Sequence, residues 1–343
     1  MTAEPGGYGI VATGHALGEP SNVADLAPRY TKDLQKIQDW GYRTFHRAGE
    51  GTGLTDLAAA AGRRALERAE IGAEHVDLVV LAMADIAEYL YWDPAAAVQG
   101  RLGSRGAEAV LANQACSAGV VAFDLIAGKF ATHPEYRVAL LVAANRVCET
   151  YWNRMESNTS IASDGAAAAV LVRGHAECQW LATEVITEGR YAHILRLPGG
   201  GAAHPFTGQG PGPGIVTNPF DRMEDHFVGD VRAMLQFSRQ VRTNIRDVVL
   251  RACQRASVAV ELVRYVLHLN DNIRALTSFA EDIGIEVGRT NAEISMDHGH
   301  LGAADQIFAM GKLLDEGRLE KGDVVALTSS GAGMHWAATL LRV

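Results

Sequence analysis

Short and almost uninterrupted apolar runs alternate with helical patterns along most of this 343-residue chain. Residues 76–82, 138–143 and 166–172 are the clearest of these runs. Strands of this kind are buried on both faces, so they belong to a sheet that helices cover on each side. The same order of elements occurs twice, which predicts two similar α/β halves, residues 1–175 and residues 176–343.

The pattern also gives approximate element positions. In the first half we expect strands at 8–17, 76–82, 109–112, 138–143 and 166–172, with helices at 56–66, at 94–102 and after residue 118. In the second half we expect strands at 180–188, 265–268, 324–328 and 336–343, with helices at 230–257 and 302–316. Residues 199–219 are rich in glycine and proline and cannot form a helix or a central strand. This segment is either a connector or a lid over a binding site, and the sequence leaves both interpretations open.

Composition and charge exclude several classes of protein. Hydrophobic residues make up 48% and charged residues 21%, which is typical of a soluble chain. The formal net charge of −9 leaves no basic face to neutralise phosphates, so we expect no nucleic-acid partner. The first residues lack the pattern of a signal peptide, and no apolar run approaches the roughly 20 residues that span a bilayer. We therefore expect a cytoplasmic protein that does not enter the membrane.

Four widely spaced cysteines, with no CxxC pair, argue against a zinc ribbon or a disulfide scaffold. We expect no bound metal, and we expect Cys148, Cys178 and Cys253 to be small buried apolar residues. Cys116 differs because it lies in the stretch Asn-Gln-Ala-Cys-Ser-Ala-Gly, where an apolar run ends and a small-residue helix begins. Free backbone N–H groups and the helix dipole stabilise negative charge on the sulfur at such a junction. Cys116 is therefore a candidate nucleophile that carries an acyl group.

A nucleophilic thiol needs a base and a pair of N–H groups that stabilise an oxyanion. Three downstream segments contain suitable residues: 267–272, 297–305 and the glycine-rich turn 329–336. Among the twelve histidines, His268 and His300 are singled out by their positions at element junctions.

The motifs around these residues resemble those of the ketoacyl-acyl-carrier-protein synthase III family of the thiolase superfamily. Residues 115–119 resemble the nucleophile motif, and residues 163–171 resemble the family's GDGAGAAVL segment. Residues 331–336 resemble its GGGFTWG turn, and residues 340–343 resemble its last strand. The resemblance implies a five-layered αβαβα fold built from two similar halves, and a homodimer. It also implies an acyl thioester of an acyl carrier protein or coenzyme A as co-substrate, with no permanently bound cofactor.

Two positions depart from the family pattern. The family's H-Q-A-N segment aligns without gaps to residues 269–272, which places Leu269 at the histidine position, followed by Asn270 and Asp271. Its N-T-S-A-A-S segment aligns to residues 300–305, which places His300 at the asparagine position. We therefore expect a permuted set of Cys116, His300 and Asp271, with Asn270 and Asp305 as alternatives to Asp271. A shift by one residue would instead return His268 to the histidine position and give a Cys-His-His set.

The permuted set favours a different second step. Decarboxylative condensation uses neutral His and Asn donors on a malonyl thioester oxygen, whereas a single His beside a carboxylate is a general base. By its similarity to the synthase-III-like acyltransferases of secondary metabolism, the chain is expected to load an acyl group on Cys116. It would then transfer that group to a hydroxyl or amine of a small acceptor such as a sugar or cyclitol, with ping-pong kinetics. The N–H groups of Cys116 and Ala332 are expected to hold the oxyanion.

Three further points stay open at this stage. A priming ketosynthase III is the first alternative function, and a non-catalytic partner subunit of another ketosynthase is the second. The family's coenzyme A-binding W-x-x-R-T-G run is absent, although Trp40 lies close to the corresponding turn, so the donor is either coenzyme A or a carrier protein. Residues 86–93 are unusually aromatic and are interpreted either as dimer interface or as the wall of an acyl pocket.

Overall fold

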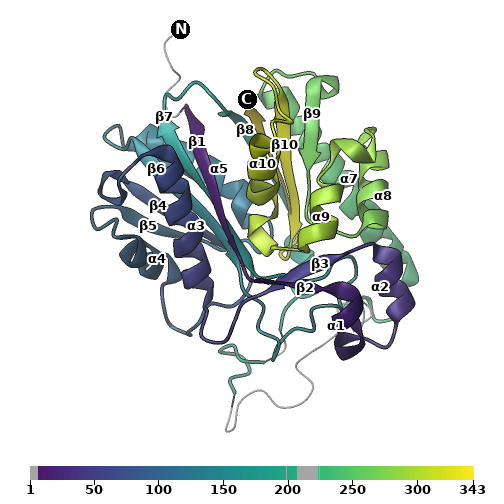
Figure 1. The fold of residues 1–343 in the computed structure, drawn as a ribbon. Coiled ribbons are helices and arrows are strands. Elements are labelled where there is room, and N and C mark those ends of the chain that lie inside the picture. Colours follow the sequence, from purple (N-terminus) through teal and green to yellow (C-terminus); the bar gives the residue numbers. More distant parts are fainter. Residues whose placement is uncertain (1–6, 198, 207–222, 224) are drawn as a thin grey trace.

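The computed structural model describes residues 7–197, 199–206, 223 and 225–343 (Figure 1). In this part of the chain nine strands form one mixed sheet in the order β5-β4-β6-β7-β1-β8-β11-β10-β9. The bounds are β1 Tyr8–Leu17, β4 Leu78–Met83, β5 Glu108–Ala112, β6 Val138–Asn145, β7 Gly165–Arg173, β8 Gln179–Thr187, β9 Val263–Leu267, β10 Val324–Gly331 and β11 His335–Arg342. Two short strands, β2 Glu19–Asn22 and β3 Thr44–Arg47, pair with each other separately.

The same strand arrangement occurs on both sides of one weak junction. In the order β4-β6-β7-β1, β4 and β6 are parallel and the other neighbours are antiparallel. In the order β9-β10-β11-β8, β9 and β10 are parallel and the other neighbours are again antiparallel. A single register pair, Gly9 with Gln179, joins the two sets. The division after residue 175 that the sequence suggests falls in the link between β7 and β8, and as a domain boundary it stays a prediction.

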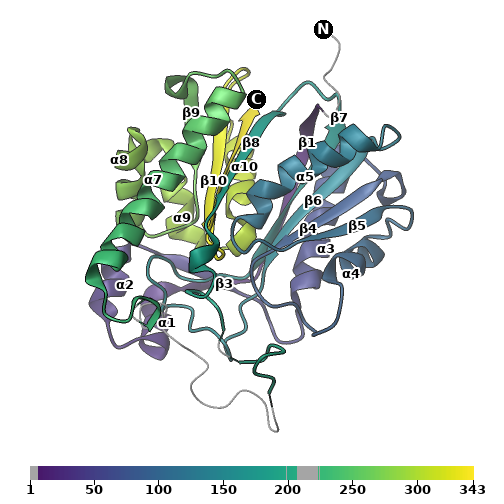
Figure 2. The ribbon, with the colours of Figure 1, turned by 180° about the vertical axis from the view of Figure 1, so that it is seen from behind.

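Helices complete the layers, and Figures 1 and 2 show them from opposite sides. Their bounds are α1 Val23–Tyr30, α2 Leu34–Trp40, α3 Leu54–Ala69, α4 Pro94–Leu102, α5 Ala118–Thr132, α7 Val231–Arg255, α8 Ile273–Ile283, α9 Ala292–His298 and α10 Asp305–Asp315. The helices α3 and α4 cover the outer face of the first strand set, and α7 covers that of the second. The helices α5 and α10 contact strands of both sets, so they form the middle layer. This is the thiolase-type α/β fold that the sequence predicted.

The central helix α5 explains an apparent membrane segment. Residues 115–132 are long and apolar enough to cross a bilayer, but half of this window is buried inside the protein. Phe123, Ile126 and Phe130 of α5 belong to the largest apolar core cluster. A helix that is apolar all round is what a middle layer requires, because the two strand sets cover it on two sides.

Most expected elements are found close to their predicted positions. The first strand at 8–17 and the helix at 94–102 match β1 and α4. The expected helix at 302–316 divides into a short 3-10 turn, Gly302–Ala304, and α10. In the glycine- and proline-rich segment, residues 199–204 form bends and turns, and residues 205–206 belong to no helix or strand. Residues 207–219 lie outside the described residues.

Candidate active site

Cys116 lies between the end of β5 and the start of α5, at the edge of the sheet where the parallel strands β4, β5 and β6 end. Ala115, just before it, has φ of 49°, a conformation that costs an L-residue roughly 1 kcal/mol or more. The Ser329 hydroxyl donates to the Cys116 carbonyl over 2.9 Å and fixes the turn from the second half of the chain. Open α/β sheets bind their ligands at this edge of the strands.

The close approach of the two halves depends on Gly119 in the first turn of α5. A Cβ on this residue would lie 2.1 Å from the carbonyl oxygen of Ala303. Glycine therefore allows the 3-10 turn at Gly302–Ala304 to lie directly against the helix. This contact brings the residues just before the turn close to the Cys116 thiol.

His300 is the histidine that reaches the thiol. Its Nε2 lies 3.3 Å from Sγ of Cys116. Its backbone is held on both sides, because its N–H donates to the Ile161 carbonyl and its carbonyl accepts from the Ser163 N–H, each over 2.8 Å. The ring therefore has a fixed position over Cys116, and its role as a catalytic base stays a prediction.

Asp305, the first residue of α10, is the carboxylate that holds His300. Its Oδ2 lies 2.5 Å from His300 Nδ1 and accepts the Asn270 N–H over 2.7 Å, and its Oδ1 accepts the Leu301 N–H over 2.6 Å. A carboxylate can only accept from these groups when ionised, so Nδ1 carries a proton and Nε2 faces the thiol. Burial lowers the pKa of His300, but the charges and hydrogen bonds of Asp305 and Cys116 outweigh it and raise the pKa well above the ordinary value.

The expected pairing of His300 with Asp271 is therefore corrected. The Asp271 carboxylate accepts the Thr159 hydroxyl over 2.7 Å and forms no hydrogen bond with His300. Burial raises the pKa of Asp271 to about 6, which is unlike a permanently charged partner of a base. The physical reason is the bend after β9: the backbone N–H of Asn270 points to Asp305, while the next side chain turns toward the loop at residue 159. Asn270 itself is fully buried, with its side chain bonded to Gly299 and Asn291.

His268 has a different environment from His300. Its Nδ1 lies 3.0 Å from the Thr328 hydroxyl, and its ring stacks on Phe279 with centroids 4.2 Å apart. Burial lowers its pKa to about 3, with a smaller contribution in the same direction from His300. His268 is thus a neutral histidine of the core. The shifted alignment would place it at the thiol, but the structure shows no contact between His268 and Cys116.

A cavity of about 260 Å³ opens onto Cys116 and His300. Ala332 lines it too, as its expected oxyanion role requires, and that role stays a prediction. Further polar side chains line the cavity that the sequence had not singled out: Asp85, Asn145, Asn153, Arg154, Glu156, Ser157 and Ser160. They come from the ends of β4 and β6 and from the loop that follows β6.

Arg154 and Asp164 form the buried ion pair that holds this loop in place. The guanidinium contacts both carboxylate oxygens, at 3.1 and 2.9 Å, and its Nε donates to Glu149 over 2.6 Å. Asp164 also accepts the backbone N–H groups of Ala48 and Val147. Both charged groups are almost completely buried, so removal of either one would take away the nearest partner of a buried charge. The conspicuous Ser-Asp-Gly segment at residues 163–165 is thus explained by loop architecture.

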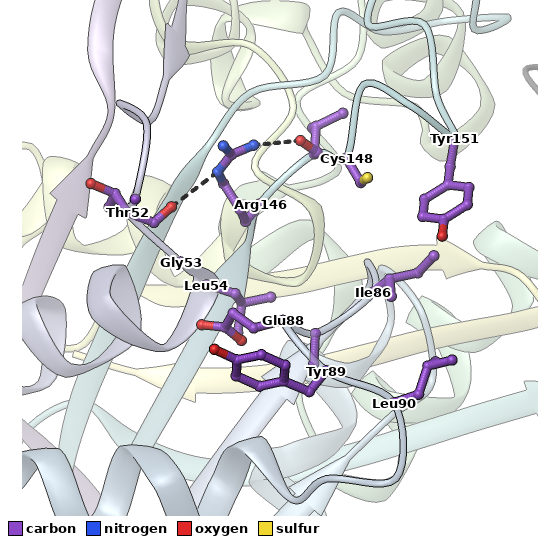
Figure 3. Close-up of a pocket in the computed structure, with 13 residues that line it drawn as sticks. Thr52, Gly53, Leu54, Ile86, Glu88, Tyr89, Leu90, Arg146, Cys148 and Tyr151 are labelled. Carbon is purple, nitrogen blue, oxygen red and sulfur yellow. Dashed lines mark hydrogen bonds between the residues drawn. The ribbon is translucent and has the colours of Figure 1, made fainter. Parts of the chain in front are cut away.

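A second pocket of about 490 Å³ lies beside the first and shares Val147 with it (Figure 3). Ile86, Tyr89 and Leu90 of the aromatic segment line this second pocket and are absent from the lining of the Cys116 cavity. Tyr91 is fully exposed. Within the described chain, the aromatic side chains of residues 86–93 therefore do not form the wall around the nucleophile.

Trp40 lies at the end of α2 and is buried. Its ring packs edge-on to Tyr42, and the Lys36 ammonium lies 4.7 Å from the ring centroid. The ring is part of a small apolar cluster with Phe45 and Met296. The Trp40 side chain therefore has a packing role at its position beside the turn that corresponds to the family's coenzyme A-binding turn.

One sequence signal could have selected Asp305 over Asp271. Asp305 stands in the run Leu-Gly-Ala-Ala-Asp-Gln-Ile-Phe, at residues 301–308, in which the surrounding residues are buried. A carboxylate inside such an apolar run must be paired, and His300 is the nearest residue in sequence able to pair with it. No comparable signal marks Asp85, because the chain separates it widely from Cys116.

Comparisons with known proteins agree with this architecture. The family model described as "3-Oxoacyl-[acyl-carrier-protein (ACP)] synthase III" matches residues 112–189, and the model of the C terminal part of the same synthase matches residues 253–343. A beta-ketoacyl-[acyl-carrier-protein] synthase III of Thiobacillus denitrificans is 28% identical over 320 residues, which cover 90% of this chain and 93% of that protein.

Solved structures show the same fold over nearly the whole chain. An acyltransferase named ChlB3 has a TM-score of 0.86 at 23% identity, with 98% of this chain and 97% of that chain covered. The 3-oxoacyl-(acyl carrier protein) synthase III of Pseudomonas aeruginosa PAO1 has a TM-score of 0.78 at 25% identity, with 98% of each chain covered.

Proposed function

We propose that this chain, which is similar to the ketoacyl-acyl-carrier-protein synthase III family, is an acyltransferase with a cysteine nucleophile. It takes an acyl group from a carrier-protein or coenzyme A thioester onto Cys116 and passes it to a hydroxyl or amine of a small acceptor. The observation that carries this proposal is the line of contacts from Cys116 to His300 to Asp305, at 3.3 and 2.5 Å.

The first step loads the enzyme. Nε2 of His300 takes the proton of Cys116, and Sγ attacks the thioester carbonyl carbon. The new carbon–sulfur bond forms as the old one breaks, and the donor thiol leaves with the proton that His300 returns. The N–H groups of Cys116 and Ala332 would stabilise the oxyanion between the two events.

The second step uses the same base. An acceptor hydroxyl or amine enters the cavity and gives its proton to Nε2 of His300 as its oxygen or nitrogen attacks the acyl carbon. The bond to Cys116 breaks, and the sulfur leaves. Asp305 keeps Nδ1 protonated and stabilises the imidazolium in both steps, because its carboxylate accepts from that nitrogen.

This arrangement favours transfer over condensation for a chemical reason. Condensation needs two neutral donors on a malonyl thioester oxygen so that an enolate forms. Here the histidine at the thiol is backed by a carboxylate that raises its pKa, while the second candidate, His268, bonds to Thr328 inside the core. A raised pKa suits a base that accepts a proton from an acceptor.

A priming ketosynthase is the second candidate function. It is favoured by the similarity to proteins named ketoacyl synthase III, whose family models match both halves of the chain. In that case, loading on Cys116 would be followed by decarboxylation of a malonyl thioester and formation of a carbon–carbon bond.

The test begins with intact-protein mass spectrometry after incubation with acyl thioesters. We expect one acyl adduct on the native protein and on Cys148→Ala, and none on Cys116→Ala; Cys148 is the matched control because it is also partly exposed. Hydroxyl and amine acceptors should then discharge the adduct without release of carbon dioxide. Carbon dioxide released from a malonyl thioester with a β-ketoacyl product would instead establish the ketosynthase, and absence of any adduct would reject both enzymes.

The family resemblance further suggests a cytoplasmic homodimer, and we include this in the proposal. Its support is the exposed sequence Tyr89-Leu90-Tyr91, with exposures of 68, 74 and 110%, in the link between β4 and α4. Apolar groups of this size on a surface mark interaction sites. Light scattering after size exclusion would show a mass twice that of the chain, and a monomer would reject this part of the proposal.

A further inference from the structure

The Cys116 cavity has an unusual balance of charge. Arg154 and His300 are the basic side chains among its described lining residues. Both are already neutralised: Arg154 by Asp164 and Glu149, and His300 by Asp305. Two acidic side chains, Asp85 and Glu156, line the same cavity and form no ion pair with a cation in the described part of the chain.

Asp85 lies shortly after β4, which ends at Met83, and Cys116 lies shortly after the neighbouring strand β5, which ends at Ala112. Because these strands are parallel and in register, their following residues lie at the same edge of the sheet. The hydrogen bond to the Asp85 carboxylate comes from the adjacent Ile86 N–H, over 2.7 Å. Burial raises the pKa of Asp85 to about 6, and the charge of Asp164 acts in the same direction.

The basic residue Arg146 does not supply the missing partner. Its guanidinium donates to the carbonyl groups of Thr52 and Val147, on the side of the second pocket (Figure 3). It lowers the pKa of Asp85 from a distance, as Arg154 does, but neither guanidinium forms an ion pair with Asp85. The carboxylate therefore faces a reaction cavity with capacity for a cationic partner.

We propose that Asp85, assisted by Glu156, binds the ammonium group of an acceptor that also carries the reacting hydroxyl. The acceptor class would be an amino alcohol of sugar or cyclitol size, and the product would be its ester. This inference rests on the proposed acyl transfer and adds the charge of the acceptor to it. A cleft with one sign of charge attracts ligands of the opposite sign and orients them.

The ammonium and the hydroxyl of such an acceptor have different roles in the reaction. A carboxylate beside an amine favours its protonated form, and an ammonium has no lone pair with which to attack the acyl carbon. The hydroxyl instead gives its proton to Nε2 of His300, its oxygen forms the ester bond, and Cys116 leaves as the bond to sulfur breaks. The ammonium keeps its proton throughout. The same negative lining disfavours donors whose acyl group ends in a carboxylate.

The experiment measures the electrostatic potential at Cys116, and it does not require the natural acceptor to be known. The native protein is treated separately with 2-aminoethyl methanethiosulfonate, a cation, and with 2-sulfonatoethyl methanethiosulfonate, an anion. Peptide mass mapping gives the rate of mixed-disulfide formation at Cys116, and each rate is divided by that of mercaptoethanol with the same reagent. We expect the normalised cation-to-anion ratio to exceed one and to fall roughly fivefold in Asp85→Asn, since one charge several ångströms away is removed.

Glu135→Gln is the matched control, because it removes the same formal charge from an exposed position before the start of β6, at the opposite edge of the sheet. Its ratio should equal that of the native protein. A native ratio of one or less, or a ratio that Asp85→Asn leaves unchanged, would overturn the inference. If circular dichroism shows that Asp85→Asn is unfolded, Glu156→Gln and Asp85→Ser take its place with the same expectation.

A second assay links the charge to transfer. Enzyme acetylated on Cys116 by an N-acetylcysteamine thioester is mixed with glucosamine, N-acetylglucosamine or glucose, and loss of the adduct is followed by mass. Faster discharge by glucosamine, reduced by Asp85→Asn, supports the inference, and equal discharge by all three opposes it. If no adduct forms, or none of the sugars discharges it, the acyl-transfer proposal loses support while the ratio of reagent rates still decides the charge of the cavity.

Discussion

Two histidines in the second half of the chain, the buried His268 and the half-buried His300, have opposite properties. His268 follows β9, bonds to a threonine hydroxyl and stacks on Phe279, and its pKa falls to about 3. His300 lies between a thiol and a carboxylate, and its pKa rises well above the ordinary value. Both lose water on folding, which disfavours the charged imidazolium.

The difference comes from one ionised partner. Asp305 is buried with three N–H donors around its carboxylate, and its charge and hydrogen bond raise the pKa of His300. His268 has a hydroxyl in the corresponding place, which cannot balance a charge. Position at an element junction, which made both histidines candidates, does not by itself make a base.

The largest expected effect is that of His300→Ala. Transfer of the acyl group from Cys116 to an acceptor should slow by about 10²–10⁴-fold, because the group that accepts the proton is lost. Single-turnover decay of the acyl adduct, followed by intact mass, measures this step. His268→Ala is the matched control, and a comparable loss of rate in that variant would remove the distinction between the two histidines.

Asp305→Asn should have the next largest effect, at roughly the lower end of the same range. Its amide would turn an N–H group toward one of the three donors that the carboxylate now accepts from, so the tautomer of His300 is no longer fixed. Asp271→Asn, which changes a carboxylate bonded to Thr159, is the control and should leave the rate nearly unchanged. The reverse order of effects would restore Asp271 as the partner of the base.

His268→Ala should act on stability. Loss of the hydrogen bond to Thr328 and of the stack on Phe279 should lower the free energy of unfolding by about 1–3 kcal/mol. Urea denaturation measures this change, and the transfer rate per folded molecule should stay within a few-fold of the native value. An intact stability combined with a lost rate would show that His268 takes part in the chemistry.

The smallest effect expected is a dependence of stability on pH. Burial lowers the pKa of His298 to about 4, and His46 lies 3.0 Å from it, so both rings are neutral when folded. Because the folded pKa is below the unfolded value of about 6.5, their contribution is full above pH 6.5 and is lost as the pH falls toward 4. The groups that face this pair are Lys312, Asp297, His15, Asp164 and Glu19.

The contribution of His300 to stability has the opposite pH dependence, because its folded pKa is raised. This contribution is full below about pH 6.5 and is lost as the pH rises through the folded pKa. Urea denaturation between pH 4 and pH 8 measures this dependence. On acidification, His298→Gln should lose less free energy of unfolding than the native protein, by roughly 1 kcal/mol. An acid loss that is equal in both proteins would contradict the neutral state of the pair.

Much of this molecule could be predicted from local patterns. The apolar strands and the junction at Cys116 followed from runs of residues and their spacing, whereas His300 was selected over His268 by the resemblance to the family's motifs. The identity of the carboxylate did not follow from these patterns, because Asp271 and Asp305 both lie within a few residues of a candidate histidine position. The direction of each side chain depends on a bend after β9 and on the first turn of α10, which spacing cannot resolve.

The sequence by itself determined the fold class and the presence of a thiol at a strand-to-helix junction, because burial on two faces and helix geometry are read from neighbouring residues. The tertiary structure alone decided which groups lie against that thiol. Cys116 and His300 are separated by 184 positions, and their contact exists because α5 and the turn before α10 meet in the middle layer. The pairing of His300 with Asp305 and the unbalanced charge of Asp85 likewise depend on distances through space, and electrostatic effects follow those distances.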